Sequence, residues 1–310
     1  MPAAVPASSR AFQGVWPALL TPLDADLNID LGRWCAHARS LIAAGCGGVT
    51  PFGTTGEGPS FSVAERRDAV NAFIGSGIPA SQILVSTSCA ALTDTLALTR
   101  HALEIGAHGC LMLPPFYLKG VPDQGVIDAY RYVIDAVADA RLSLYLYHIP
   151  QVAAVGLSHH VIATLKKLYP QTIVGIKDSS CELAHSLALA EAFMPQLTVY
   201  VGNELDLPAL GRRGSSGAIS GLANFMPRLV HRLVTLPDAS GTAADLERTR
   251  QLLARLGGYA LIPALKGIMA GRSGDAGWLR VRPPLVALTA GEMQTLMSAI
   301  TDLGLNTAAD

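Results

Sequence analysis

The sequence predicts an α/β protein, a (β/α)8 TIM barrel with a helical extension at its C-terminal end. Up to residue 225, short apolar strand-like runs alternate with amphipathic helical runs, at intervals of roughly 20 to 35 residues. No Gly-x-Gly-x-x-Gly turn follows any predicted strand, so an open dinucleotide-binding sheet has no support. We therefore expect the barrel, with a loose N-terminal tail, in residues 1–225. The helical extension, packed on the barrel, is expected in residues 226–310.

Eight predicted strands define the barrel. Each is a short run of mainly apolar residues, bounded by turn-forming residues such as Gly, Pro and Ser. In chain order, the strands are expected at residues 14–22, 48–52, 83–88, 110–113, 142–147, 173–180, 197–201 and 218–220.

Helices are predicted between these strands from capping residues and apolar periodicity. Gly45 and Gly106 end two of them, and Ser62 with Glu65 forms a capping box that starts another, which runs to about residue 74. Gly45 ends the helix expected at residues 31–44, and Gly106 ends the one expected at residues 93–105. Three further barrel helices are expected at residues 124–138, 158–168 and 182–193. The helices of the extension are expected at residues 227–236, 243–256, 259–270 and 290–303.

Composition points to a protein that acts on small molecules. The 310 residues carry a net charge of -1, and 15% of them are charged, so the chain has no basic face for nucleic acid and no polybasic membrane anchor. Gly, Pro, Arg or Asp interrupts every apolar run before the roughly 18 residues that a membrane span needs. The start of the chain resembles a loose tail more than a signal peptide, so we expect a cytoplasmic protein.

Neither a metal nor a cofactor is predicted. The five cysteines are scattered and never spaced as Cys-x-x-Cys, which argues against a disulfide framework and a zinc site. His159 and His160 adjoin at a predicted helix start, so their side chains diverge, and no carboxylate or cysteine completes a tetrahedral set.

Lys177 is the first candidate for chemistry. It lies at the C-terminal end of the strand predicted at residues 173–180, and parallel barrels carry their chemistry at this end of the strands. A lysine held there loses hydration, which leaves more free amine to attack a carbonyl carbon and form a Schiff base. The alternative is a lysine that extends past the strand end or pairs with Asp178.

Other polar groups follow the ends of neighbouring predicted strands. Residues 53–57, Gly-Thr-Thr-Gly-Glu, could present hydroxyls and backbone N–H groups to a carboxylate, or form an ordinary glycine-rich turn. Tyr147 could pass protons to and from a carbonyl oxygen, although most strand-end tyrosines only pack a ring. A carboxylate cradle, a phenol and an amine together are what Schiff-base chemistry on a 2-oxo acid requires.

In these motifs the chain resembles the dihydrodipicolinate synthase and N-acetylneuraminate lyase family of class I pyruvate-dependent aldolases. The resemblance covers about residues 14–305. It rests on four motifs in the family's order, which are Gly53-Thr-Thr-Gly-Glu57, Tyr147-x-x-Pro150, Gly175-x-Lys177-Asp-Ser and Gly217-Ala-Ile-Ser-Gly-Leu-Ala-Asn224.

The resemblance implies roles for residues of these motifs. Lys177 would form the imine, and Tyr147 would shuttle protons. Thr54 and Thr55, which follow Gly53, would hold the carboxylate of the 2-oxo acid, and Thr54 would also relay protons.

The resemblance also implies an assembly, a homotetramer built as a dimer of dimers. Tyr117 matches the family's tyrosine that reaches across a subunit interface. Ile219 matches the position whose carbonyl lines the pocket.

The chain departs from the family's pattern where a second substrate would bind. Val152 stands where dihydrodipicolinate synthases carry an arginine for the carboxylate of aspartate semialdehyde, and valine cannot bind a carboxylate. His148 replaces an asparagine; it could add a hydrogen bond or an acid–base group, or be structural. Glu204 and Ser179 lie where sugar-acid lyases of the family present groups to hydroxyls. Glu204 could equally cap the next helix.

We therefore expect a lyase, a Schiff-base aldolase or dehydratase that acts on a 2-oxo acid. The expected partner is a small molecule, most of all a 2-oxo-3-deoxy sugar acid or a related hydroxy-2-oxo acid, with pyruvate as product or co-substrate. One alternative is 4-hydroxy-tetrahydrodipicolinate synthase, which condenses pyruvate with aspartate semialdehyde. The alternative of another class is a barrel that binds a sugar acid without catalysis.

Overall fold

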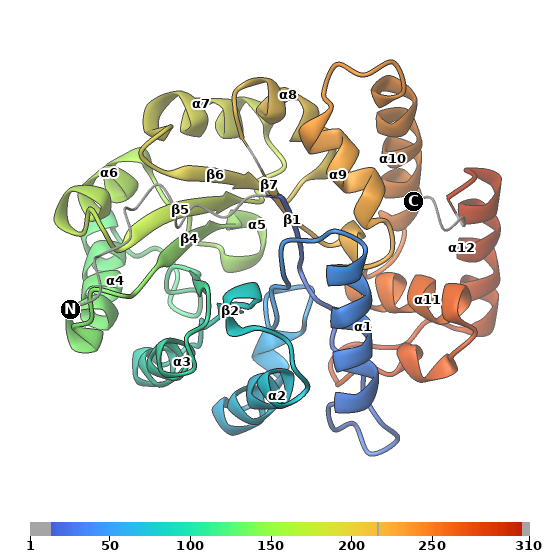
Figure 1. Cartoon of the computed structure of the whole chain (residues 1–310), viewed down its shortest axis with the longest axis horizontal. Helices are drawn as coiled ribbons and strands as arrows, with labels where there is room; N and C mark the ends of the chain where they lie inside the picture. The colour runs from blue at the N-terminus through green and yellow to red at the C-terminus, as the bar shows by residue number, and fades with distance from the viewer. Residues whose placement is uncertain (1–13, 216, 306–310) are drawn as a thin grey trace.

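The structure, a computed structural model, describes residues 14–215 and 217–305. Within these residues, seven strands form one parallel sheet in the order β1-β7-β6-β5-β4-β3-β2. Helices surround the sheet (Figure 1), so the architecture is TIM-barrel-like. The strands are β1 (Gly14–Pro17), β2 (Leu84–Ser86), β3 (Gly109–Met112), β4 (Leu144–His148), β5 (Ile173–Asp178), β6 (Thr198–Val201) and β7 (Gly217–Ser220).

The strand predicted at residues 48–52 is wrong, since this segment forms only isolated bridges. Thr50 bridges to the residue after β1, and Val49 bridges to the residue before β2, both in parallel orientation. Pro51 has no N–H to donate and Phe52 has a left-handed backbone (φ 60°), so no ladder continues. The two bridges connect the edge strands of the sheet.

The helices that follow the strands agree with the predicted ones to within one or two residues at each end. The predicted capping box at Ser62 and Glu65 is confirmed. The predicted helices are α1 (Leu31–Ala43), α2 (Val63–Gly75), α3 (Leu92–Glu104), α4 (Asp123–Val137), α6 (His159–Leu168) and α7 (Leu183–Phe193). Two short helices were not predicted, α5 (Pro150–Ala153) and α8 (Leu207–Arg212).

In the residues that the structure describes, four α-helices follow β7. They are α9 (Pro227–Thr235), α10 (Thr242–Leu256), α11 (Leu261–Ser273) and α12 (Ala290–Asp302). Helix α9 packs on β1 and β7 and so continues the layer of helices around the sheet. Helices α10, α11 and α12 lie together on one side of the molecule, opposite α4 and α6 (Figure 1). The division of the chain at residue 225 stays a prediction.

The register between neighbouring strands determines which side chains face the barrel interior. Tyr147 of β4 pairs with Lys177 of β5, which in turn pairs with Tyr200 of β6. Successive side chains of a strand point to opposite faces, so Tyr145 shares the inner face with Tyr147, and both belong to one buried cluster. A Cβ at Gly175 would lie 2.7 Å from the Tyr145 ring, so the glycine makes room for it.

A buried ion pair connects α11 to the loop that follows residue 52. The Lys266 ammonium contacts a carboxylate oxygen of Glu57, and both side chains are fully buried. Lys266 also donates to the carbonyl of Arg280 at 2.8 Å. Burial lowers the pKa of Lys266, and the Glu57 charge offsets part of that effect. Removing either partner would leave an uncompensated buried charge, so the pair holds the loop against α11.

Arg282 makes a second connection between the C-terminal part and the first helices. Its guanidinium donates to the carbonyls of Leu27 at 3.0 Å and Ser60 at 2.7 Å, and it stacks over the Phe61 ring. It also pairs with Glu65, whose pKa it lowers to about 2.

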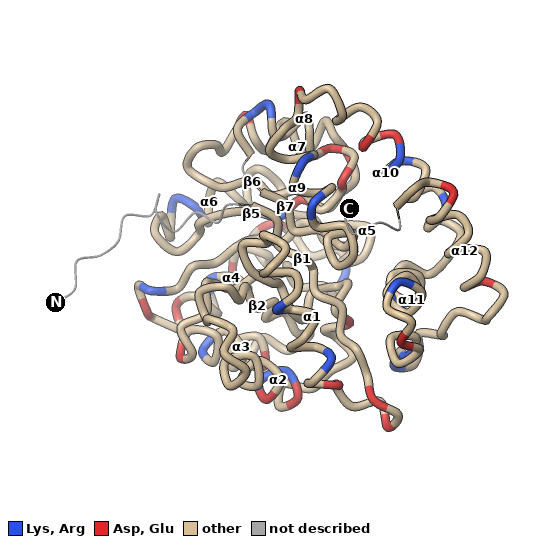
Figure 2. Tube along the Cα trace, turned by 45° about the vertical axis from the view of Figure 1, so that its right-hand side comes forward, with Lys and Arg blue, Asp and Glu red and all other residues tan. Residues whose placement is uncertain are grey.

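Charged residues of both signs are scattered among the helices (Figure 2). In the part of the chain that the structure describes, no single helix is long and apolar enough to cross a membrane. The pair α10 and α11, bent by 115°, meets that test by length and composition alone.

The Glu57–Lys266 pair can be tested by unfolding. We expect Lys266→Met to lower the free energy of unfolding by about 3–5 kcal/mol, because it leaves Glu57 buried without its counter-ion. The double variant Glu57→Gln, Lys266→Met should recover part of this loss, since it buries no charge at that position. Urea titrations of the three proteins provide the measurement. A single variant as stable as the wild type would contradict the assignment.

Candidate active site

Lys177 and Tyr147 form the centre of the site, at the carboxyl end of the sheet. The Lys177 Nζ donates a hydrogen bond to Tyr147 Oη at 3.1 Å and lies 4.2 Å from the centre of the tyrosine ring. Both side chains are buried, with exposed fractions of 5% and 2%. An amine held this way is oriented by the phenol and sheltered from bulk water.

The alternative in which Lys177 pairs with Asp178 is wrong. Asp178 is the next residue of β5, so its side chain points to the opposite face of the sheet. Its carboxylate accepts hydrogen bonds from His185 Nδ1 at 3.0 Å, Ser186 Oγ at 2.7 Å and the Ser180 N–H at 2.9 Å. The Asp178 carboxylate therefore bonds to groups on the outer face of the sheet, while the Lys177 side chain points into the barrel interior.

Thr54 extends the hydrogen-bonded row that begins at Lys177. Its Oγ1 lies 3.4 Å from Tyr147 Oη, and either atom can donate. A proton can therefore pass between the threonine hydroxyl, the phenol and a group near the amine. Thr54 belongs to the loop that the buried Glu57–Lys266 pair anchors.

These groups line one cavity of about 330 Å3. The predicted site residues that it brings together are Thr54, Thr55, Tyr147, Lys177, Ser179, Glu204 and Ile219. Gly53 lines an adjoining cavity of about 250 Å3, which shares Thr54 and Val152 with the first.

Gly202, at the end of β6, makes room beside the lysine. A Cβ at this position would lie 3.1 Å from Lys177 Cε and would collide with the hydroxyl of Ser179. A side chain at position 202 would therefore displace Lys177 or Ser179.

Glu204 lines the cavity but does not cap α8 through its side chain. Its carboxylate accepts hydrogen bonds from Ser220 Oγ at 2.5 Å and the Leu222 N–H at 3.3 Å, so it ties the end of β6 to the end of β7. Burial raises its pKa, and the hydrogen bond from Ser220 and the charge of Lys177 offset part of that effect.

His148 lies outside the cavity, contrary to its predicted role in substrate binding. It follows Tyr147 on β4, so its side chain points to the outer face of the sheet. There its Nδ1 accepts the N–H of Leu157 at 2.9 Å, and its ring stacks on His185 at 4.5 Å. His148, Asp178 and His185 lie close enough together to suggest a metal site, but hydrogen bonds already occupy the Nδ1 of His148 and the Asp178 carboxylate.

Comparison with known proteins identifies the family. The dihydrodipicolinate synthetase family model matches residues 11–303 of this chain. The chain belongs to this family. An uncharacterized DapA-like lyase of Chloroflexus aurantiacus is 34% identical over 293 residues, which cover 93% of this chain and 95% of the relative. Membership makes the protein an enzyme of the lyase class, with the fold of the family's aldolases.

Solved structures of family members share the fold over nearly the whole chain. The crystal structure of dihydrodipicolinate synthase from Agrobacterium tumefaciens superposes with a TM-score of 0.89 at 32% identity, covering 94% of this chain and 99% of that one. YagE, a prophage protein of the same family from E. coli K12, was solved in complex with pyruvate. It gives a TM-score of 0.86 at 25% identity, covering 95% of this chain and 99% of that one.

Two residues away from the centre of the site bear on the family resemblance. Val152 of α5 lines both cavities and is 55% exposed, so an aliphatic side chain stands where the family resemblance places an arginine. Tyr117, in the loop after β3, is 75% exposed and does not reach the cavity of its own subunit.

Several residues of the cavity were not predicted from the sequence. Gln151 of α5 and Cys181 line it, as do Leu253 of α10 and Leu261 and Leu265 of α11. Gln151 has a recognisable signal, because it lies directly after the Tyr-x-x-Pro motif. The leucines have none, since periodicity predicts helices but not which cavity a helix end will border.

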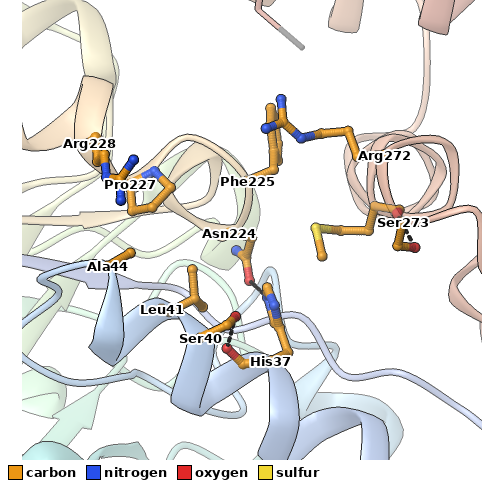
Figure 3. Close-up of a pocket in the computed structure, with 11 residues that line it drawn as sticks. His37, Ser40, Leu41, Ala44, Asn224, Phe225, Pro227, Arg228, Arg272 and Ser273 are labelled. Atoms are coloured by element: carbon orange, nitrogen blue, oxygen red, sulfur yellow. Dashed lines mark hydrogen bonds between the residues drawn. The ribbon is translucent and has the colours of Figure 1, made fainter. Parts of the chain in front are cut away.

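A separate hollow of about 300 Å3 lies between α1, α9 and α11 (Figure 3). The buried ring of His37 contacts Asn224 Oδ1 at 3.2 Å, and burial lowers its pKa to about 4. Ser40 donates to a carbonyl of its own helix, as does Ser273. Because these polar groups are hydrogen-bonded within the protein, the cavity of Lys177 stays the candidate active site.

The titration of Glu204 gives a test of its buried position. Its pKa is raised in the folded state, so its contribution to stability is complete below the ordinary value of 4.5 and is lost as the pH rises through the folded value. We expect Glu204→Gln to melt above the wild type at pH 8, with the difference shrinking toward pH 4.5. Calorimetry across this range would contradict the assignment if the difference did not change with pH.

Proposed function

We propose that the protein is a Schiff-base aldolase or dehydratase that acts on a hydroxylated 2-oxo acid, with pyruvate as product or co-substrate. The observation that carries this proposal is the 3.1 Å hydrogen bond between Lys177 Nζ and Tyr147 Oη inside a cavity. A buried amine beside a phenol supplies both a nucleophile and a proton shuttle.

In the cleavage direction, the neutral amine of Lys177 attacks the C2 carbonyl carbon, and water leaves as the protonated imine forms. Tyr147 then takes the proton of the C4 hydroxyl while its own phenolic proton passes toward Thr54. The C3–C4 bond breaks, its electron pair forms the enamine, and an aldehyde departs. The enamine gains a proton at C3, and water releases pyruvate and the free amine. Dehydration would instead remove a C3 proton and a hydroxyl from the same imine.

The carboxylate of the 2-oxo acid is assigned to the loop after residue 52. Thr54 and Thr55 line the cavity, and Gly53 allows the backbone to turn beside them. The carbonyl of Ile219 on β7 would complete this end of the site.

Within this substrate class, the sequence predicts a 2-oxo-3-deoxy sugar acid. Ser179, Gln151 and Glu204 line the cavity and supply polar atoms that hydroxyls of such a chain require. Synthesis of 4-hydroxy-tetrahydrodipicolinate is the second candidate, and the resemblance to the Agrobacterium tumefaciens synthase favours it. Val152 weighs against this candidate because it offers nothing to the carboxylate of aspartate semialdehyde.

We expect borohydride to trap pyruvate on Lys177. Mass spectrometry of protein treated with pyruvate and sodium borohydride should find the reduced adduct on the peptide that contains Lys177. Lys177→Ala should lose the adduct, whereas Lys167→Ala, which removes an exposed lysine of α6, should keep it. Binding without any adduct would favour a barrel that binds sugar acids without catalysis.

The proton relay predicts a separate effect of Tyr147→Phe. Removing a positioned acid–base group lowers the rate by about 100-fold or more. We expect kcat to fall by this factor while pyruvate still binds, measured by steady-state kinetics and calorimetry. A variant with unchanged kcat would contradict the role of the phenol.

The proposed assembly is a homotetramer in which Tyr117 acts in the site of a neighbouring subunit. Its exposure in the single chain and the adjoining apolar cavity beside Thr54 support this proposal. Co-expression of two weakly active variants, Tyr117→Ala and Lys177→Ala, should restore activity, because a mixed pair contains one complete site. Tyr132→Ala, which removes a tyrosine of α4 that is 46% exposed, should be active alone. Co-expressed variants that gain no activity would contradict a shared site.

A further inference from the structure

The cavity above Lys177 has two kinds of lining. Near the strand ends it offers an amine, a phenol and hydroxyls, from Lys177, Tyr147, Thr54 and Thr55. The rest of the lining is largely aliphatic and comes from the β4–α5 segment, β7 and the helices beyond it. These residues are Ile149, Val152, Ile219, Leu222, Leu253, Leu261 and Leu265.

Two of the aliphatic side chains remain half exposed although they border the cavity. Leu261, the first residue of α11, is 50% exposed, and Val152 is 55% exposed. Single exposed apolar residues are normal on protein surfaces, but these two line the same cavity. A ligand that covers both would remove their apolar surface from water, which is favourable only if the ligand is itself apolar there.

The charges of the cavity argue against a second carboxylate on the substrate. Among the residues that line this cavity and the adjoining one, Lys177 is the only lysine or arginine. In the imine its nitrogen is bonded to C2, so it cannot pair with a carboxylate beyond C4. The other charged side chains of these linings are Glu204 and Glu57; the Glu57 charge is compensated by Lys266, and neither side chain offers a positive charge to an anion.

The polar groups farther from the amine are partly engaged by the protein. Gln151 Nε2 donates to the carbonyl of Ser179 at 2.5 Å, and Asn203 Nδ2 donates to Asp206 at 2.9 Å. Glu204 accepts the hydroxyl of Ser220. These hydrogen bonds reduce the donors and acceptors that the lining offers, so a long polyol chain would place several of its hydroxyls against leucine.

From these observations we infer that the part of the substrate beyond C4 is uncharged and apolar. The substrate class is a 4-hydroxy-2-oxo acid with an aryl or alkyl group at C4. This inference rests on the proposed Schiff-base function and replaces the polyol chain of a sugar acid by an apolar group. In the condensation direction, the enamine carbon of Lys177-bound pyruvate bonds to the aldehyde carbon, the aldehyde oxygen gains a proton from Tyr147, and water then hydrolyses the imine.

Three aldehydes of different chemistry test the inference. Benzaldehyde, D-glyceraldehyde and aspartate semialdehyde are each condensed with pyruvate by the wild-type enzyme, and kcat/KM is measured for each. A pocket that gains affinity from apolar contacts distinguishes such substrates by about 10-fold or more. We expect benzaldehyde to exceed both other aldehydes by at least this factor.

A matched pair of variants connects the preference to the aliphatic lining. Leu261→Ser should lower the ratio of kcat/KM for benzaldehyde to that for D-glyceraldehyde by about 10-fold. Leu236→Ser removes a leucine with the same exposed fraction, 50%, that does not line the cavity, and should leave the ratio unchanged. Leu261 is half exposed at the first residue of a helix, so loss of folding is not expected.

The outcomes separate this inference from the proposed function. If pyruvate is trapped on Lys177 but D-glyceraldehyde or aspartate semialdehyde is the better substrate, the Schiff-base function stands and the apolar substrate class is overturned. An unchanged ratio in Leu261→Ser also overturns it. If no pyruvate adduct forms at all, both the function and the substrate class are overturned.

Discussion

The site depends on the register of one pair of parallel strands. Because β4 and β5 are paired so that Tyr147 faces Lys177, the phenol and the amine meet without any loop to position them. Strands packed on a filled barrel interior are rigid, and Tyr145 fills that interior where Gly175 has no side chain. The geometry of the reacting atoms is therefore set by the backbone hydrogen bonds of the sheet.

The other half of the site is held by the C-terminal helices. The buried pair of Glu57 and Lys266 fixes the loop of residues 53–57 against α11, and the same helix supplies Leu261 and Leu265 to the cavity. One helix thus supports both the proposed carboxylate cradle and the aliphatic lining. Changes in α11 would act on both ends of a substrate at once.

Much of the fold and the centre of the site can be predicted from the sequence. Periodicity and capping predicted the helices, and strand-end position predicted that Lys177, Tyr147 and Thr54 would meet. A strand was predicted at residues 48–52, but only isolated bridges form there, because Pro51 and the left-handed backbone of Phe52 end the pairing. His148 was misplaced although strand alternation would have assigned it to the outer face, opposite Tyr147.

Other features of the site were not predicted at all, for a different reason. Local sequence patterns do not determine which distant segments come into contact. Neither the Glu57–Lys266 contact nor the position of the leucines at the cavity could therefore be predicted. The charge of Lys266 even argues against the full burial that the structure shows.

The isolated bridges at Val49 and Thr50 join the two edge strands of the sheet. Five residues of β4 pair with β5, whereas Val49 and Thr50 connect β2 and β1 through one bridge each. Backbone hydrogen bonds support both bridges, because the Thr50 N–H donates to the carbonyl of Pro17 and the Val49 N–H donates to the carbonyl of Gln82, each at 2.9 Å. The loop of residues 53–57 follows directly, so the sheet fixes where that loop begins. With both edge strands covered in this way, the sheet of the described residues offers a second chain no open edge on which to add a strand.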